Sequence, residues 1–331
     1  MDVAANLALV MRHAPAVLRA AGLPVTGFAD ATRVEGGSKK GVYRLRWTDG
    51  FSAILYVWSD AEDYWPPADE DDPAGVFVHA TGARLFAACA SELRAAGVRI
   101  PRVYLLDLSH AAYPADIALV EDINGGTIEQ LLESGSAAAD PVMERLGAML
   151  KPMWRECRPR IGKVGAGTVP VSLTCERIVF NRAIRQLAGA ADRVPRVAAA
   201  RAQLDETLRA LASDIEPRSG CSLIHGELDS GHVLLTAERE PVLIDIEGLM
   251  YFDVEWEHVF LRLRYGQAYR WLRIDGLDER RMWLYSFAMD LSLIEGPLRL
   301  VDGGHPDREF LLEIVHYATG RVLAAAIRPS S

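Results

Sequence analysis

The chain has 331 residues, of which 50% are hydrophobic, and a formal net charge of −9. This length and composition allow a large core and favour two domains or one two-lobed unit. The acidic balance, without a basic stripe, argues against a nucleic-acid partner, and no apolar run is long enough to cross a membrane.

The cysteines and the N-terminus indicate the compartment. The four cysteines have no close spacing, which fits neither a zinc site nor a disulfide framework and favours free thiols in a reducing cytosol. The N-terminal residues lack the basic start and the long apolar core of a signal peptide. We therefore expect a cytoplasmic protein.

The first third of the chain is rich in predicted strands. Helical spacing of apolar residues over 3–21 is followed by two alternating segments around the turn Thr48-Asp49-Gly50. An acidic stretch with two prolines then predicts an exposed loop. The expected elements are helices over 3–21 and 78–96, strands over 42–47, 51–58, 98–107 and 117–122, and the loop near 59–75.

The rest of the chain is mainly helical. Helices are expected over 127–215, apart from a Gly/Pro-rich stretch, and again from about 253, with a strand–loop–strand segment between them. Within the last region, 291–304 reads as a loop that faces the substrate. The sequence thus predicts an α+β fold with a small β-rich lobe over 1–123, which includes the leading helix and the acidic insertion, and a larger lobe over 124–331.

The segment "LIHGELDSGHVLLTAEREPVLIDIEG", residues 223–248, carries the chemistry. Phosphoryl transfer needs held phosphates, Mg²⁺ on oxygen ligands and an acceptor hydroxyl aimed in line. Glu227 and Asp245 each follow a short apolar strand. If these strands are neighbours in one small sheet, the two carboxylates lie at the same end of it.

An ordered set of motifs resembles the aminoglycoside phosphotransferase and choline kinase group, which are small-molecule kinases with a protein-kinase-like fold. The resemblance covers most of the chain and is more specific than a lone glycine-rich loop. It implies a phosphate-covering loop, a hinge whose backbone at Glu121 and Ile123 meets the base, a catalytic loop, a metal-binding strand end and an acid-x-x-x-acid stretch that holds the catalytic loop. The matching segments are Gly36-Gly37-Ser38-Lys39-Lys40-Gly41, 119–127, 225–232, Ile244-Asp245 and 253–257.

The resemblance also implies roles for the acidic residues. Asp245 is expected to be the principal Mg²⁺ ligand, and Glu227 the base or acceptor-orienting group where the family has aspartate, with Asp229 as the alternative. His232 occupies the position of a metal-binding asparagine; it is a candidate ligand, or a group that bonds a phosphate or holds the loop. Glu247 is a further candidate oxygen ligand, or a solvated acid in a turn.

The small lobe departs from the family pattern at two positions. Tyr56 stands where the family has a phosphate-binding lysine, and Phe86 where a helix glutamate pairs with that lysine. Loss of both is physically coherent, because loss of one would leave an unpaired charge in a partly buried place. The backbone of Gly36, Gly37 and Ser38 could bind phosphate. We hypothesise that Lys39 or Lys40 replaces the missing lysine; the alternative is a solvated hairpin tip.

These expectations describe a Mg²⁺-dependent O-phosphotransferase that moves the γ-phosphate of ATP or GTP to an aminoglycoside-like or other hydroxylated natural product, as in antibiotic resistance. Acidic residues after 253 would favour a cationic substrate. One alternative is a pseudokinase-like protein that binds a nucleotide or metabolite without fast turnover. Another is a choline, sugar or amino-alcohol kinase.

Overall fold

The computed structural model divides into two compact units. Unit 1 comprises Met1–Tyr64, His79–Arg145 and Ser230–Glu247, and unit 2 comprises Trp65–Val78, Leu146–Asp229 and Gly248–Ser331. The structure describes residues 3–34, 39–63, 75–77, 81–165, 173–213, 215–218, 220–305 and 307–327.

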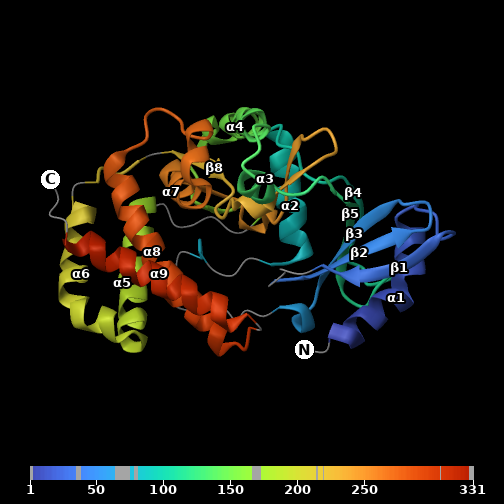
Figure 1. Ribbon diagram of the computed structural model, residues 1–331, viewed down its shortest axis with the longest axis horizontal. Helices are drawn as coiled ribbons and strands as arrows, with labels where there is room; N and C mark the ends of the chain where they lie inside the picture. The colour runs from blue at the N-terminus through green and yellow to red at the C-terminus, as the bar shows by residue number, and fades with distance from the viewer. Residues whose placement is uncertain are drawn as a thin grey trace. The chain divides into compact units, whose positions relative to one another are not determined.

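A five-stranded antiparallel sheet is the centre of unit 1. Helix α1 (Val3–Ala20) buries Val10 and Val17 against Tyr43 and Leu45, which alternate with more exposed residues along one strand, and Figure 1 shows α1 beside this sheet. The strand order is β1-β2-β3-β5-β4. The strands are β1 (Phe28–Arg33), β2 (Gly41–Trp47), β3 (Ser52–Trp58), β4 (Val103–Asp107) and β5 (Asp116–Glu121).

Strand β1 is an addition to the predicted elements. Its sequence FADATR has few apolar residues, and its burial does not alternate, so period-2 patterning could not reveal it. It forms the edge of the sheet by pairing with β2.

The start of the acidic insertion is not an exposed loop. The short 3₁₀ helix η1 (Asp60–Glu62) brings Glu62, which is 2% exposed, to the Tyr43 hydroxyl and the Arg33 guanidinium. These donors compensate the buried carboxylate, so this part of the prediction is wrong. Residues 64–74 lie outside the described residues.

The linker after β5 pairs with a hairpin from much later in the chain. The Gly125 amide donates to the Leu235 carbonyl (2.8 Å), and the Leu235 amide donates to the Gly126 carbonyl (2.9 Å). These bonds place 230–247 in unit 1, and the lobe boundary at 123–124 stays a prediction. The other elements here are α2 (Ala83–Ala95), α3 (Ile128–Glu133), η2 (Ser230–His232), β9 (Val233–Leu235), β10 (Pro241–Leu243) and η3 (Ile246–Gly248).

Unit 2 is mostly helical. Helices α8 and α9 run side by side in Figure 1, and α5 packs on α6 and α8. Its helices are α5 (Cys175–Arg193), α6 (Pro195–Ser213), α7 (Val254–Tyr265), η4 (Gly266–Trp271), α8 (Glu279–Asp302) and α9 (Arg308–Ile327), while α4 (Ala139–Arg155) begins in unit 1. Its sheet has the order β6-β8-β11-β7, with β6 (Cys157–Arg158), β7 (Gly162–Lys163), β8 (Cys221–Ile224) and β11 (Met250–Phe252).

Two predictions about these elements are wrong. Strands β8 and β10 are not neighbours, because β9 turns back to pair with β10 while β11 pairs with β8. Most of the segment 291–304 is helix, because its buried residues Leu291, Ile294 and Leu300 keep helical spacing through Gly296-Pro297. The α+β class is confirmed, with an antiparallel sheet early in the chain and mostly helices later.

Among the described residues, no helix combines the length and apolarity needed to cross a membrane.

Candidate active site

The end of strand β10 presents the predicted metal ligand Asp245. Hydrogen bonds fix the preceding backbone: the Leu243 amide donates to the Arg99 carbonyl (2.9 Å) and the Ile244 amide to the His232 carbonyl (3.0 Å). Asp245 itself has a φ of +54°, in the left-handed region that residues other than glycine rarely adopt. Strained backbone of this kind clusters at functional sites.

Lys40 lies between the two predicted metal-binding carboxylates. Its Nζ is 2.9 Å from Asp245 Oδ1 and 2.7 Å from Glu247 Oε1, and the residue is only 6% exposed. The alternative of a solvated hairpin tip is therefore wrong for Lys40. Glu247 is 3% exposed, so the alternative of a solvated turn acid is wrong for Glu247 as well.

The opposite charges of Lys40 and Asp245 each stabilise the ionised form of the other. Burial alone would lower the pKa of Lys40, but Asp245 and Glu247 raise it well above its usual value. Burial alone would raise the pKa of Asp245, but the Lys40 ammonium, with His232 and Lys39 further off, holds it well below its usual range. Lys40 and Asp245 therefore both carry charge near neutral pH, and with the ion pair to Glu247 the three residues form an ion triad.

An aromatic group forms the wall beside this triad. Lys40 Nζ lies 5.2 Å from the centre of the Tyr56 ring, and the Tyr56 and Phe86 rings meet edge to face at 5.8 Å. Trp58 packs on the same Phe86 ring at 5.5 Å. Aromatic contact thus joins β3 to α2 at the two positions where the family pattern has an ion pair.

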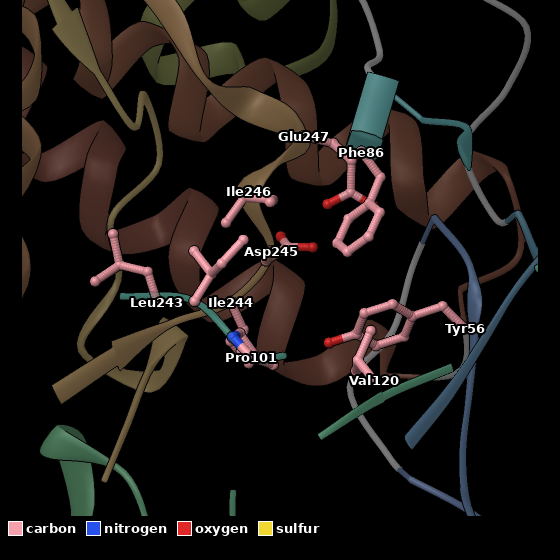
Figure 2. A pocket seen from close by; sticks show the side chains of 10 residues that line it. Tyr56, Phe86, Pro101, Val120, Leu243, Ile244, Asp245, Ile246 and Glu247 are labelled. Atoms are coloured by element: carbon pink, nitrogen blue, oxygen red, sulfur yellow. The ribbon is translucent and has the colours of Figure 1, made fainter. Parts of the chain in front are cut away.

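A small pocket opens next to these groups. Figure 2 shows Tyr56 and Phe86 beside the carboxylates of Asp245 and Glu247. The remaining lining is apolar and consists of Ile100, Pro101, Val120, Leu243, Ile244 and Ile246. The pocket therefore combines a mainly apolar lining with two carboxylates.

The carboxylate oxygens at this strand end are suitable ligands for a hard divalent cation. Asp245 and Glu247 supply carboxylate oxygens, which Mg²⁺ prefers. Among the described residues, the buried Glu247 Oε2 has no hydrogen-bond partner, which leaves one oxygen for a cation. His232 Nε2 is 3.9 Å from Asp245 Oδ2, so His232 lies beside the cluster.

The predicted catalytic loop is held by a buried glutamate. Glu257 of α7 accepts hydrogen bonds from the His225 amide (3.1 Å) and the Gly226 amide (2.8 Å). This is the holding contact that the resemblance implied for the acid-x-x-x-acid stretch. Burial raises the pKa of Glu257 to about 7, against the lowering effect of these two bonds.

The two candidate bases differ in their surroundings. Glu227 is exposed at the surface of unit 2. Asp229 is half-buried, its carboxylate pairs with Arg264, and its carbonyl accepts from the Tyr265 hydroxyl (3.3 Å). Asp229 is therefore engaged in holding the loop to α7.

The other acid of that stretch, Asp253, lies in a fully buried network. Its carboxylate accepts from Arg281 of α8 and from the Tyr285 hydroxyl, and Arg281 also pairs with Glu176 at 3.1 Å. The network ties α5 and α8 to the start of α7, the helix that carries Glu257.

The predicted nucleotide-binding residues fall into two groups. Gly36, Gly37 and Ser38 lie outside the described residues, and Lys39 follows directly after them. The Glu121 amide donates to the Arg102 carbonyl at the end of β5, and Ile123 is buried.

Several acids that were expected to attract a cationic substrate have structural roles instead. Glu255 makes two bonds to Arg218 (2.7 and 2.8 Å), Asp290 bonds Arg321 (2.8 Å), and Asp278 caps α8. These carboxylates are neutralised within unit 2, so they do not support a strongly acidic pocket.

Sequence reasoning missed the partners of these acids, namely Arg264, Arg281 and the pairing of Lys40 with Asp245 and Glu247. Lys40 and Asp245 are 205 positions apart, and no local pattern links them. The sequence did contain a chemical signal. Asp245 and Glu247 lie two positions apart, and an acid that is buried in such a pair requires a nearby cation.

Comparisons with known proteins agree with this arrangement. The model of the phosphotransferase enzyme family matches residues 30–271. A search among curated proteins found no match.

Solved structures share the fold at low identity. A thermostable mutant of aminoglycoside phosphotransferase APH(4)-Ia, solved with ADP and hygromycin B, is 16% identical with a TM-score of 0.61, covering 94% of this chain and 96% of that chain. A choline kinase from Streptococcus pneumoniae is 12% identical with a TM-score of 0.59, covering 91% and 95%. A proposed fructosamine-3-kinase from Thermobifida fusca YX-ER1 is 20% identical with a TM-score of 0.53, covering 96% and 98%.

The family match spans most of the chain, including the catalytic loop and the Asp245 strand end, and the kinase-like fold extends over nearly all of it. The predictions of a kinase-like fold and of a phosphotransferase are thereby confirmed, and the chain belongs to the phosphotransferase enzyme family.

Proposed function

We propose that this protein transfers the γ-phosphate of a nucleoside triphosphate, ATP or GTP, to a hydroxyl group of a small molecule. The observation that carries the proposal is the carboxylate pair of half-buried Asp245 and buried Glu247, in which Glu247 Oε2 has no hydrogen-bond partner among the described residues, in a chain of the phosphotransferase family. A chain that had lost this chemistry would have no need to keep two acids so close together, one of them buried at a cost in desolvation.

The residues of the strand end would position the phosphates. Asp245 and Glu247 would hold Mg²⁺, which neutralises charge on the phosphate oxygens when bound. Lys40, His232 and the Gly36–Ser38 segment would contribute further contacts to the phosphates, and the backbone at Glu121 and Ile123 would meet the base. The solved relative with bound ADP supports a nucleotide as co-substrate.

Glu227 is the favoured base. Glu227 is exposed, whereas Asp229 is half-buried and pairs with Arg264. A carboxylate within hydrogen-bond reach of the acceptor would orient the hydroxyl and take its proton. Asp229 would support this step by fixing the loop.

The acceptor is proposed to be an aminoglycoside-like compound or another hydroxylated natural product, which would make antibiotic resistance one biological outcome. The relative with bound hygromycin B supports this class. The choline kinase relative favours a second candidate, an amino-alcohol kinase. Because several acids of unit 2 are paired with arginines, the proposal rests on the hydroxyl groups of the acceptor and not on a strongly acidic pocket. We expect the reaction to take place in the cytoplasm, where ATP and GTP are available.

A panel of aminoglycosides, sugars, choline and other amino alcohols, followed by ³¹P NMR with Mg²⁺ and ATP or GTP, tests the proposal. We expect at least one phosphorylated acceptor, and a loss of about 10²-fold or more in Glu227→Gln. Asp229→Asn should lose less. Nucleotide binding without transfer to any acceptor would instead favour the pseudokinase-like alternative.

A further inference from the structure

The Lys40 ammonium already occupies the place of a cation between Asp245 and Glu247. It makes ion pairs of 2.9 and 2.7 Å with one oxygen of each. Both partners belong to the same compact unit as Lys40, and Lys40 and Glu247 are buried. A divalent cation that uses these oxygens must share them with, or take them from, the ammonium.

Charge balance makes this competition strong. The two nearby carboxylates repel one another, and one ammonium offsets part of their charge. A divalent cation would offset all of it, but next to the ammonium it would add unfavourable repulsion in a site that water screens poorly. The free protein should therefore bind a divalent cation weakly while Lys40 keeps these contacts.

Lys40 can leave the carboxylates without any rearrangement of the sheet. Its neighbour Gly41 begins β2 and pairs with Val57, and a Cβ at Gly41 would lie 2.7 Å from Glu62 Cδ, so the backbone here is fixed. The lysine side chain carries its compact charge at the end of a flexible chain of four carbons. The face of Tyr56, at 5.2 Å, gives the ammonium a favourable surface along which to move.

Resting on the function proposed above, we propose that Lys40 guards the metal-binding carboxylates in the nucleotide-free protein and passes to phosphate oxygens when nucleotide and Mg²⁺ arrive together. Lys40 thus supplies from the start of β2 the charge that the family pattern places on β3. The exchange couples the binding of Mg²⁺ to the binding of nucleotide. Mg²⁺ alone must displace Lys40 from the carboxylates, and nucleotide alone must draw Lys40 away from them, so each ligand favours the binding of the other.

Binding of Mn²⁺ to nucleotide-free protein, followed by the loss of the free-ion EPR signal, tests the guard directly. Lys40→Met removes the ammonium and leaves Asp245 and Glu247 facing each other. We expect this variant to bind Mn²⁺ at least tenfold more tightly than the native protein. Equal or weaker binding by folded Lys40→Met overturns the proposal.

Three variants sharpen the result. Lys39→Met removes the same charge one residue away, and a rise as large as that of Lys40→Met would show a general charge effect and overturn the proposal. The double variant Lys40→Met/Glu247→Gln should lose the gain; if the gain persists, the metal binds elsewhere and the proposal fails. Lys40→Gln keeps a hydrogen-bond donor and repeats the test if Lys40→Met does not fold.

ADP binding by calorimetry, with Mg²⁺ at a concentration that saturates both proteins, tests the second half of the exchange. Lys40→Met should bind ADP at least tenfold more weakly than the native protein, and unchanged binding overturns the transfer to phosphate. If the native protein binds no nucleotide with or without metal, the proposed function fails. The Mn²⁺ comparison still decides whether Lys40 guards the carboxylates, so the two failures are distinguishable.

Discussion

At the scale of single residues, buried acids hold the catalytic loop in place. Glu257 presents both carboxylate oxygens to the amides of His225 and Gly226. A carboxylate is the side chain that can accept both bonds, since a glutamine has only one acceptor oxygen. The loop is therefore positioned through its backbone, and the proposed base Glu227 lies in the same loop, directly after these two amides.

The burial of Glu257 gives stability a defined pH dependence. Its pKa is raised from 4.5 to about 7 in the folded protein, so between these pH values the folded state binds more protons than the unfolded state. The contribution of Glu257 to the free energy of unfolding is therefore fully present below pH 4.5. It falls by about 3 kcal/mol as the pH rises to about 7. Urea unfolding of the native protein and Glu257→Gln at pH 5 and pH 7.5 should show a smaller change in the variant. Equal changes would contradict this.

Arg281 is the cation on which the second buried network depends. It is 1% exposed and bonds Asp253 and Glu176, so Arg281→Met removes the cation of buried Glu176 and leaves buried Asp253 only the longer contact with Arg218, at 3.8 Å. We expect a loss of about 3–5 kcal/mol in chemical unfolding. Arg209→Met is the matched control, because that arginine forms an exposed pair with Asp205, and it should leave the midpoint unchanged. Similar effects of the two variants would contradict the role of Arg281.

At the scale of elements, the linker after β5 lies so close to β9 that no side chain fits at Gly125. A Cβ at Gly125 would lie 2.4 Å from the Leu235 carbonyl oxygen. Gly125→Ala should therefore destabilise the protein by about 2–3 kcal/mol. Gly320→Ala in α9, where nothing lies within 4 Å, should be neutral or stabilise by up to about 1 kcal/mol. Thermal unfolding separates the two, and equal melting temperatures would show that the linker can shift.

Elements with strong periodicity could be predicted from the sequence, and those defined by partners could not. Helix α1 and strands β2 and β3 follow their apolar patterns closely. Strand β1 has little pattern of its own, and β6, β7 and β11 have two or three residues each, so their pairing partners define them. The separation of β8 from β10 likewise depends on long-range pairing that no local signal reports.

At the scale of the whole molecule, the family match and the ion triad support one account. The motifs around Asp245 and the catalytic loop could be recognised from sequence spacing, and Tyr56 and Phe86 could be recognised as departures. The compensation could not be predicted, because the contacts of Lys40 with Asp245 and Glu247 join segments about 200 residues apart. Lys40 restores charge to a site whose expected lysine is replaced by the buried ring of Tyr56.

The central claim is that Asp245 belongs to a working metal–phosphate site. The most direct measurement is calorimetry of ATP and GTP binding, with and without Mg²⁺, to the native protein and to Asp245→Asn. The account predicts binding to the native protein that strengthens at least tenfold with Mg²⁺, and loss of this strengthening in the variant. Absence of nucleotide binding in folded native protein, or equal Mg²⁺ dependence in Asp245→Asn, would contradict it.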